Sequence, residues 1–257
     1  MCCTDSRYRV SFAILLLNWS LTPSQMKIGI LTTGHPPENT IDKHGSYANA
    51  FERLLTGYDF EFTNWNCLEG DFPETVNDAD GWLLTGSKFG AYEDLPWIAP
   101  LEDFIRSAYS KDVPIVGICF GHQILAQALG GRVAKFDGGW SVGRVEYNLE
   151  GHSDAIPLYA WHQDQVVAIP EDARVVGSTP FCEYAALAYG DKAYSVQPHP
   201  EFSESFFEDL FAARKGGLPK ETIAQAENSI AMAKPTDSAA IANTIAAFFK
   251  NSVGRTD

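Results

Sequence analysis

Apolar runs that alternate with helical stretches constrain this chain more than any other feature of its sequence. Four runs in the first half have the length and composition of strands: 27–33, 59–65, 81–85 and 113–118. Three stretches carry apolar side chains at helical spacing: 46–55, 96–109 and 120–129. This alternation predicts an α/β fold with a doubly wound, mainly parallel sheet, in which ligands bind beyond the carboxyl ends of the strands.

The second half of the chain changes character twice. Three segments between residues 132 and 197 have β patterning: 140–147, 174–178 and a hairpin at 185–197. Helical patterns then follow at 203–214, 219–233 and 237–250, separated by Gly216-Gly217 and Pro235. We therefore predict one main domain at 26–202 and a helical C-terminal extension at 203–257 that packs on the same domain.

Composition limits the partners and the compartment. The 257 residues carry a net charge of −14, which repels nucleic-acid phosphates and anionic membranes, so we expect neither as a partner. The five cysteines form no CxxC pair. A disulfide framework is therefore not expected, and a reducing, cytoplasmic location is preferred. No spacing indicates a metal site.

The N-terminal extension, residues 1–25, has two interpretations. The apolar run at 10–19 follows Arg7 and Arg9, as in the centre of a signal peptide, but the best cleavage site, Thr22-Pro23-Ser24, is poor. Met26 opens a clean strand. We prefer a fold that begins at Met26, with 1–25 disordered or the product of a mis-assigned start; the signal peptide remains the alternative.

The segment GICFG, residues 117–121, has the pattern of a nucleophile elbow with cysteine in place of serine. Gly117 and Gly121 leave room for a tight turn between a strand and a helix. Cys119 then lies at the helix N-terminus, where the dipole and free N–H groups favour a thiolate. The alternative is a small buried side chain, an interpretation that suits Cys67 and Cys182 well.

The segment QPHPEF, residues 197–202, supplies a candidate base. The two prolines hold the backbone around His199 extended, so His199 and Glu201 can face the same side. Glu201 would then orient the imidazole and stabilise its charged form. A single histidine is more often a loop or core residue, but its coincidence with a cysteine framed by glycines favours catalysis.

Together, GICFGHQILAQALGG and QPHPEF resemble the class I glutamine amidotransferase family, in particular a stand-alone glutaminase domain of the GMP-synthase type. The resemblance runs from Met26 to about Phe202. It implies a Cys-His-Glu triad at Cys119, His199 and Glu201, and no cofactor or metal. It also implies a flavodoxin-like three-layer sandwich with a mainly parallel central sheet, which a small β subregion and the C-terminal helices would extend.

The same resemblance assigns further site residues. LLTGSKFG resembles the family's oxyanion loop, so the backbone N–H groups of Gly86 and Ser87 would join that of Phe120. Ser87 stands where many members have glycine. The remaining implied residues contact or border the glutamine: Gln123, Trp161, His162 and Gln163. For His162, a purely structural role is an equal alternative.

Three functions fit these residues. The first is hydrolysis of the γ-amide of glutamine, with ammonia passed to a separate synthase subunit. The second is hydrolysis of γ-glutamyl peptides or amines by the same residues, and the third is a non-catalytic regulatory role. The acceptor of the nitrogen is not readable from fold or triad. Three basic residues near the site segments could meet a substrate carboxylate: Lys88, Arg132 and Arg144.

Overall fold

The computed structural model describes residues 25–231 and 235–253. The predicted extension at 1–25 lies outside the described residues except for Gln25, as do Cys2 and Cys3. No helix within these described ranges is long and apolar enough to cross a membrane.

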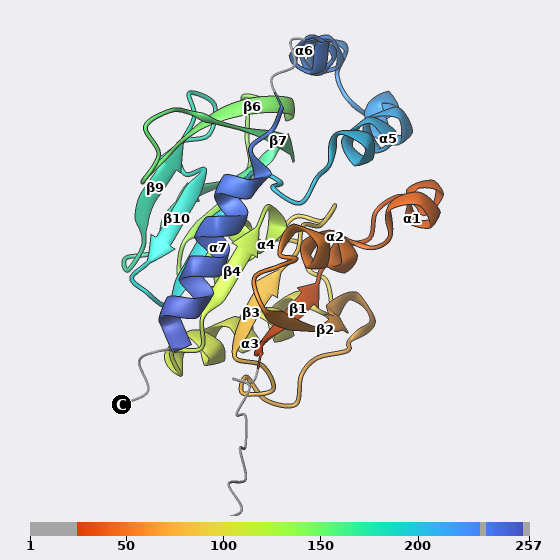
Figure 1. The fold of residues 1–257 in the computed structure, drawn as a ribbon. Coiled ribbons are helices and arrows are strands. Elements are labelled where there is room, and N and C mark those ends of the chain that lie inside the picture. Colours follow the sequence, from red (N-terminus) through yellow and green to blue (C-terminus); the bar gives the residue numbers. More distant parts are fainter. Residues whose placement is uncertain (1–24, 232–234, 254–257) are drawn as a thin grey trace, which may run out of the picture.

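A nine-stranded mixed sheet forms the centre of the molecule (Figure 1). Its parallel half contains β2 (Phe60–Asn66), β1 (Met26–Thr32), β3 (Gly81–Leu84), β4 (Ile115–Ile118) and β11 (Ala193–Val196), in that order. Its antiparallel half continues with β10 (Ala186–Tyr189), β9 (Arg174–Ser178), β6 (Ser141–Leu149) and β7 (Ile156–His162). A separate ribbon pairs β5 (Arg132–Lys135) with β8 (Asp164–Ala168).

Helices cover both faces of the parallel half. The helical elements are α1 (Glu38–His44), α2 (Tyr47–Leu54), η1 (Cys67–Glu69), α3 (Ile98–Ser110), α4 (Phe120–Ala128), α5 (Glu204–Arg214), η2 (Lys215–Gly217), α6 (Lys220–Ala231) and α7 (Ser238–Val253). One core cluster joins the sheet to α2 and α7, and the other joins it to α3 and α4. Strand side chains alternate between the clusters, as in β3, where Leu83 packs in the first and Leu84 in the second. The predicted three-layer α/β fold is thus confirmed.

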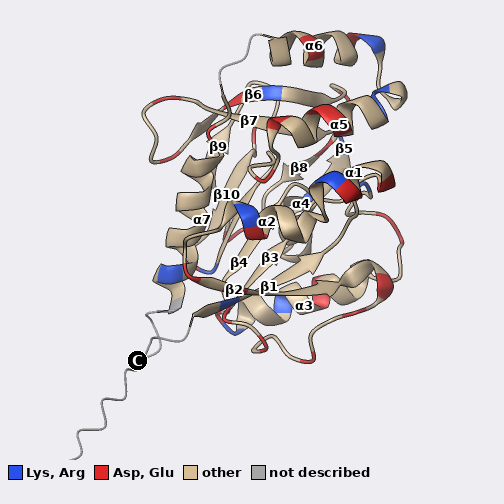
Figure 2. Cartoon of the chain, turned by 45° about the vertical axis from the view of Figure 1, so that its right-hand side comes forward, with Lys and Arg blue, Asp and Glu red and all other residues tan. Residues whose placement is uncertain are grey.

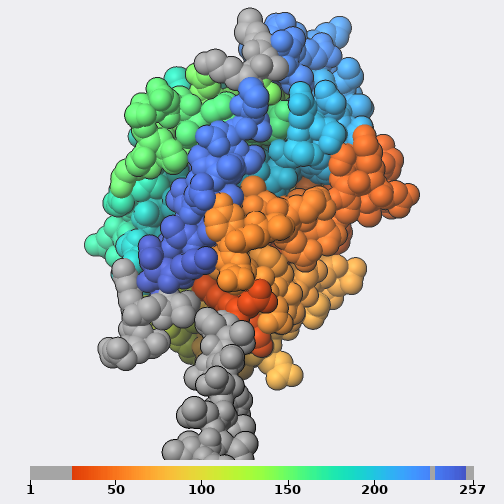
Figure 3. Space-filling model, viewed as in Figure 1, coloured from red at the N-terminus to blue at the C-terminus, as the bar shows by residue number. Residues whose placement is uncertain are grey.

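The C-terminal helices pack on this body in two places. Helix α7 lies across one face of the sheet, between α2 and the antiparallel strands (Figure 3). Helix α6 covers β6 so closely that a Cβ on Gly143 would lie 2.3 Å from Ser229 Oγ. Helix α5 lies beside α1 (Figure 2), where Lys43 Nζ and His44 Nε2 each lie 2.6 Å from an Asp209 carboxylate oxygen. Together, α5, α1 and α2 lie near the carboxyl ends of the parallel strands (Figure 1).

Most local predictions hold, and the exceptions have physical causes. Ser46 begins α2 with a capping box, in which its Oγ accepts a bond from the Asn49 N–H. Helix α1 lies between Pro36-Pro37 and Gly45, where no helix was predicted; these residues bracket the helix instead of interrupting it. Strand β7 was not predicted either, and it contains Pro157, which an edge strand tolerates. The β-rich region mostly extends the central sheet, and only β5 and β8 stand apart.

Candidate active site

Three loops meet where adjacent parallel strands end. Leu84 in β3 pairs with Gly117 in β4, and Ile118 pairs with Val196 in β11. The segments after these strands contain Gly86, Cys119 and His199. A Cβ on Gly86 would lie 3.0 Å from His199 Cε1 and 3.7 Å from Cys119 Cβ, so the three residues are in close proximity.

Cys119 lies in a strained turn between β4 and α4. Its φ of 53° and ψ of −103° fall in a backbone region that residues other than glycine rarely adopt. Holding a cysteine in this conformation costs about 1–3 kcal/mol of folding free energy. The flanking glycines are sterically required. A Cβ on Gly117 would lie 2.4 Å from the Gly121 carbonyl oxygen, and a Cβ on Gly121 would lie 2.5 Å from the Leu84 oxygen. The turn holds the thiol at the N-terminus of α4, and Cys119 as a whole is 4% exposed.

His199 and Glu201 form a buried pair. His199 Nδ1 lies 2.7 Å from Glu201 Oε1, and the ring stacks on Phe202 with centroids 4.0 Å apart. The His199 N–H donates to the Tyr159 carbonyl at 2.8 Å, which fixes the backbone. Burial lowers the pKa of His199, but the interactions with Cys119 and Glu201 outweigh burial and raise the pKa to about 10. These two partners therefore favour the charged form of the imidazole.

Two threonines support the loop after β3. Thr33 Oγ1 donates to the Thr85 carbonyl at 2.9 Å, and the Thr33 N–H donates to Thr85 Oγ1 at 3.0 Å. Ser87 Oγ accepts a hydrogen bond from the Phe89 N–H at 3.3 Å. The serine at this position, where glycine was expected to be more common, thus closes a turn of the loop. Phe120 is the first residue of α4, where a backbone N–H has no carbonyl partner within the helix.

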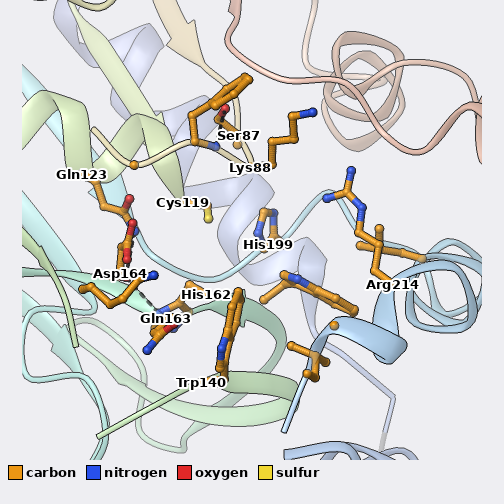
Figure 4. Close-up of a pocket in the computed structure, with 18 of the residues that line it drawn as sticks. Ser87, Lys88, Cys119, Gln123, Trp140, His162, Gln163, Asp164, His199 and Arg214 are labelled. Carbon is orange, nitrogen blue, oxygen red and sulfur yellow. Dashed lines mark hydrogen bonds between the residues drawn. The ribbon is translucent and has the colours of Figure 1, made fainter. Parts of the chain in front are cut away.

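A cavity of about 430 Å³ opens above Cys119 and His199 (Figure 4). Eight of the residues predicted for the site line it: Gly86, Ser87, Cys119, Gln123, Trp161, His162, Gln163 and His199. The structure thus brings together segments from the elbow, the oxyanion-type loop, β7 and the loop before α5. The side chains of the other two predicted residues lie behind its surface, with Phe120 packed on Trp97 and Glu201 behind His199.

Gln123 and His162 line the cavity in defined orientations. Gln123 Nε2 donates to the Asp164 carbonyl at 2.9 Å and to Gln197 Oε1 at 3.1 Å, which leaves its side-chain oxygen as the acceptor for a ligand. His162 Nδ1 lies 3.3 Å from the Asp164 carbonyl. Burial lowers the pKa of His162 to about 3, so the ring is neutral. With Nδ1–H donating to that carbonyl, Nε2 carries a lone pair and has no protein partner among the described residues.

The basic residues of the cavity are only partly those that the sequence suggested. Lys88 lines the cavity, whereas Arg132 and Arg144 do not. Arg144 instead lies over the Tyr159 ring, 5.9 Å from its centroid. The sequence interpretation missed two cations that line the cavity, Lys135 at the end of β5 and Arg214 at the end of α5. No local pattern marks Arg214, because its place in the cavity depends on how α5 returns to the parallel strands.

Within residues 25–231 and 235–253, no group of three or more His, Cys, Asp or Glu side chains is placed to hold a metal ion. Cys119, His199 and Glu201 bring a thiol, an imidazole and a carboxylate together. A thiolate beside an imidazolium is a nucleophile with its own proton donor.

Comparisons with known proteins show which family this chain belongs to. The glutamine amidotransferase class-I family matches residues 39–214. A glutamine amidotransferase-like protein of Schizosaccharomyces pombe is 31% identical over 209 residues, 74% of this chain and 84% of the relative. Gamma-glutamyl peptidase 4 of Arabidopsis thaliana is 28% identical over 197 residues, 71% of this chain and 78% of the relative. The glutamine-hydrolyzing GMP synthase subunit of Halobacterium salinarum is 31% identical over 185 residues, 67% of this chain and 95% of the relative.

Solved structures share the fold. The crystal structure of a glutamine amidotransferase from Methylobacillus flagellatus superposes with a TM-score of 0.68 at 21% identity, over 89% of this chain and 95% of the other. At that identity the likeness concerns the fold alone, and it confirms the flavodoxin-like architecture.

Proposed function

Because this chain belongs to the class I glutamine amidotransferase family, we propose that it hydrolyses the γ-amide of glutamine through a thioester on Cys119. The observation that carries the proposal is the convergence of a strained cysteine at a helix N-terminus with a buried histidine–carboxylate pair. The family relationship supports the proposed reaction class, and the geometry supports the role proposed for each residue.

In the first half-reaction, the Cys119 thiolate attacks the γ-carbonyl carbon and forms a C–S bond. The negative charge moves to the carbonyl oxygen, where the N–H groups of Phe120 and of the Gly86–Ser87 loop would stabilise it. The C–N bond then breaks. The departing nitrogen takes a proton from the His199 imidazolium and leaves as ammonia.

In the second half-reaction, the neutral His199 removes a proton from water as the water attacks the thioester. The C–S bond breaks, glutamate leaves, and the thiolate and imidazolium are restored. Glu201 keeps the ring oriented through Nδ1 in both steps. The ammonia would pass to a synthase on a separate chain.

Hydrolysis of γ-glutamyl peptides is the second candidate. The cavity extends past His199 to Arg214 and Leu218, which ammonia as a leaving group does not need. Both candidates use the same thioester, and they differ only in the group attached to the γ-nitrogen.

A substrate comparison on the purified chain tests the proposed function. We expect glutamine to be converted to glutamate and ammonia, measured by coupled ammonia detection, with a γ-glutamyl dipeptide assayed in parallel for release of its second amino acid. Turnover of the dipeptide without turnover of glutamine would refute the glutaminase proposal in favour of the second candidate.

The pair of His199 and Glu201 predicts a shift in pH dependence. Catalysis needs the imidazolium, so activity should fall as pH rises through the pKa of His199, which the structure raises to about 10. Glu201→Gln removes one of the charges that raise this pKa, and the alkaline limb of the pH profile should move down by about one unit or more. We also expect kcat/KM at neutral pH to fall roughly 10- to 100-fold.

Glu204 provides a matched control, because it is exposed, lies three residues after Glu201 and is the first residue of α5. Glu204→Gln makes the same chemical change without touching His199, and its alkaline limb should coincide with that of the wild type. Coincident limbs in Glu201→Gln and wild type would show that Glu201 does not stabilise the imidazolium.

A further inference from the structure

The cavity has two chemically different ends. In Figure 4, Gln123 and Asp164 lie on one side of Cys119, and Arg214 lies on the other, with His199 between Cys119 and Arg214. Tyr47 lines the same cavity as Arg214. Burial raises the pKa of Tyr47, while the charge of Arg214 lowers it and the charges of Glu201 and Cys119 raise it.

The chemistry assigns the two ends. The nitrogen that leaves must reach His199 to collect its proton, so the group attached to that nitrogen extends toward the His199 side. The γ-glutamyl part, held on the opposite side of the scissile bond, then lies toward Gln123 and Asp164. Arg214 therefore belongs to the end that receives the leaving group.

The leaving-group end combines positive charge with apolar surface. Arg214 is half-buried, and no carboxylate of the described residues lies within 4.0 Å of its guanidinium nitrogens. Leu210, one turn earlier on α5, and Leu218, just after η2, also line the cavity. A half-buried guanidinium without a carboxylate partner suits a planar anion, which it can bind through two parallel hydrogen bonds.

We propose that Arg214 binds the carboxylate of the amino acid released from a γ-glutamyl amino acid, while Leu210 and Leu218 contact its side chain. The inference rests on the proposed thioester chemistry at Cys119 and adds to it the class of leaving group. Cleavage breaks the γ-glutamyl C–N bond, the freed amine takes its proton from His199, and its carboxylate stays on Arg214 until the amino acid dissociates. The site thus accepts more than ammonia.

The test compares γ-glutamyl-phenylalanine with its C-terminal amide, which lacks the negative charge. The kcat/KM of the wild type should be about 10- to 100-fold higher for the free acid than for the amide, because a hydrogen bond to a charged group contributes a difference of that size. Arg214→Met should bring this ratio close to one. Lys215→Met is the matched control: Lys215 is the next residue, pairs with Glu227 at 3.2 Å and does not line the cavity, so the ratio should stay as in the wild type.

Each outcome decides a separate point. A wild-type ratio near one, or a ratio that Arg214→Met leaves intact, overturns the leaving-group site even if glutamine is hydrolysed. If instead no γ-glutamyl compound is turned over, the proposed function fails, and titration calorimetry still tests the site. Binding of γ-glutamyl-phenylalanine to Cys119→Ala should then weaken about 10- to 100-fold when Arg214→Met is added, and equal affinities would overturn it.

Discussion

Replacing Cys119 by alanine is expected to lower turnover of any γ-glutamyl substrate about 10⁵-fold, since the variant has no nucleophile to form the thioester. The fold should survive. The backbone at a φ of 53° is strained equally for alanine and for cysteine. The substitution also removes only a small part of the side chain, the thiol. The free energy of unfolding should therefore change by only about 1 kcal/mol. Steady-state kinetics together with chemical denaturation measure the two effects separately.

Cys67 provides the matched control for this substitution. It is fully buried in the core cluster between the sheet and α3, it does not line the cavity, and burial raises the pKa of its thiol to about 12. Cys67→Ala should cost about 1–2 kcal/mol of stability through the space it leaves, with kcat unchanged. Full activity in Cys119→Ala would end the nucleophile assignment, and equal losses in both variants would reduce it to a packing effect.

The parts of the site that follow strand ends could be predicted from the sequence. In a parallel sheet, the carboxyl ends of neighbouring strands lie at one edge, so a cysteine after β4 and a histidine after β11 meet there. The local patterns are also rigid: glycines frame Cys119, and prolines flank His199. These residues are predictable because short-range sterics fix their conformation and the topology of the sheet fixes their neighbours.

The far end of the cavity could not be predicted in this way. Arg214 ends a helix with no unusual local pattern, and its position depends on contacts between α5 and α1, such as Asp209 with Lys43 and His44. These contacts join residues 165 or more positions apart in the chain. The orientation of Gln123 is a similar case, because it depends on the Asp164 carbonyl in the separate β5–β8 ribbon. Specificity here arises from packing between distant segments.

Gly117→Ala should be strongly damaging although it removes no catalytic side chain. The new Cβ would lie 2.4 Å from the Gly121 oxygen and 2.9 Å from the His122 nitrogen, both backbone atoms of α4, so the helix N-terminus must move. We expect a loss of about 3 kcal/mol in the free energy of unfolding. Displacement of Cys119 and the Phe120 N–H should also lower kcat about 100-fold or more in the molecules that remain folded.

Gly216→Ala is the control for Gly117→Ala. A Cβ there meets no atom within 4 Å, and its backbone does not require glycine, so Gly216→Ala should be neutral or stabilise the fold by up to about 1 kcal/mol through the unfolded state. Denaturation midpoints and kcat, measured side by side, separate the two glycines. Wild-type stability and kcat in Gly117→Ala would show that the tight contact between the elbow and α4 does not position Cys119. The strained turn would then have no role in catalysis.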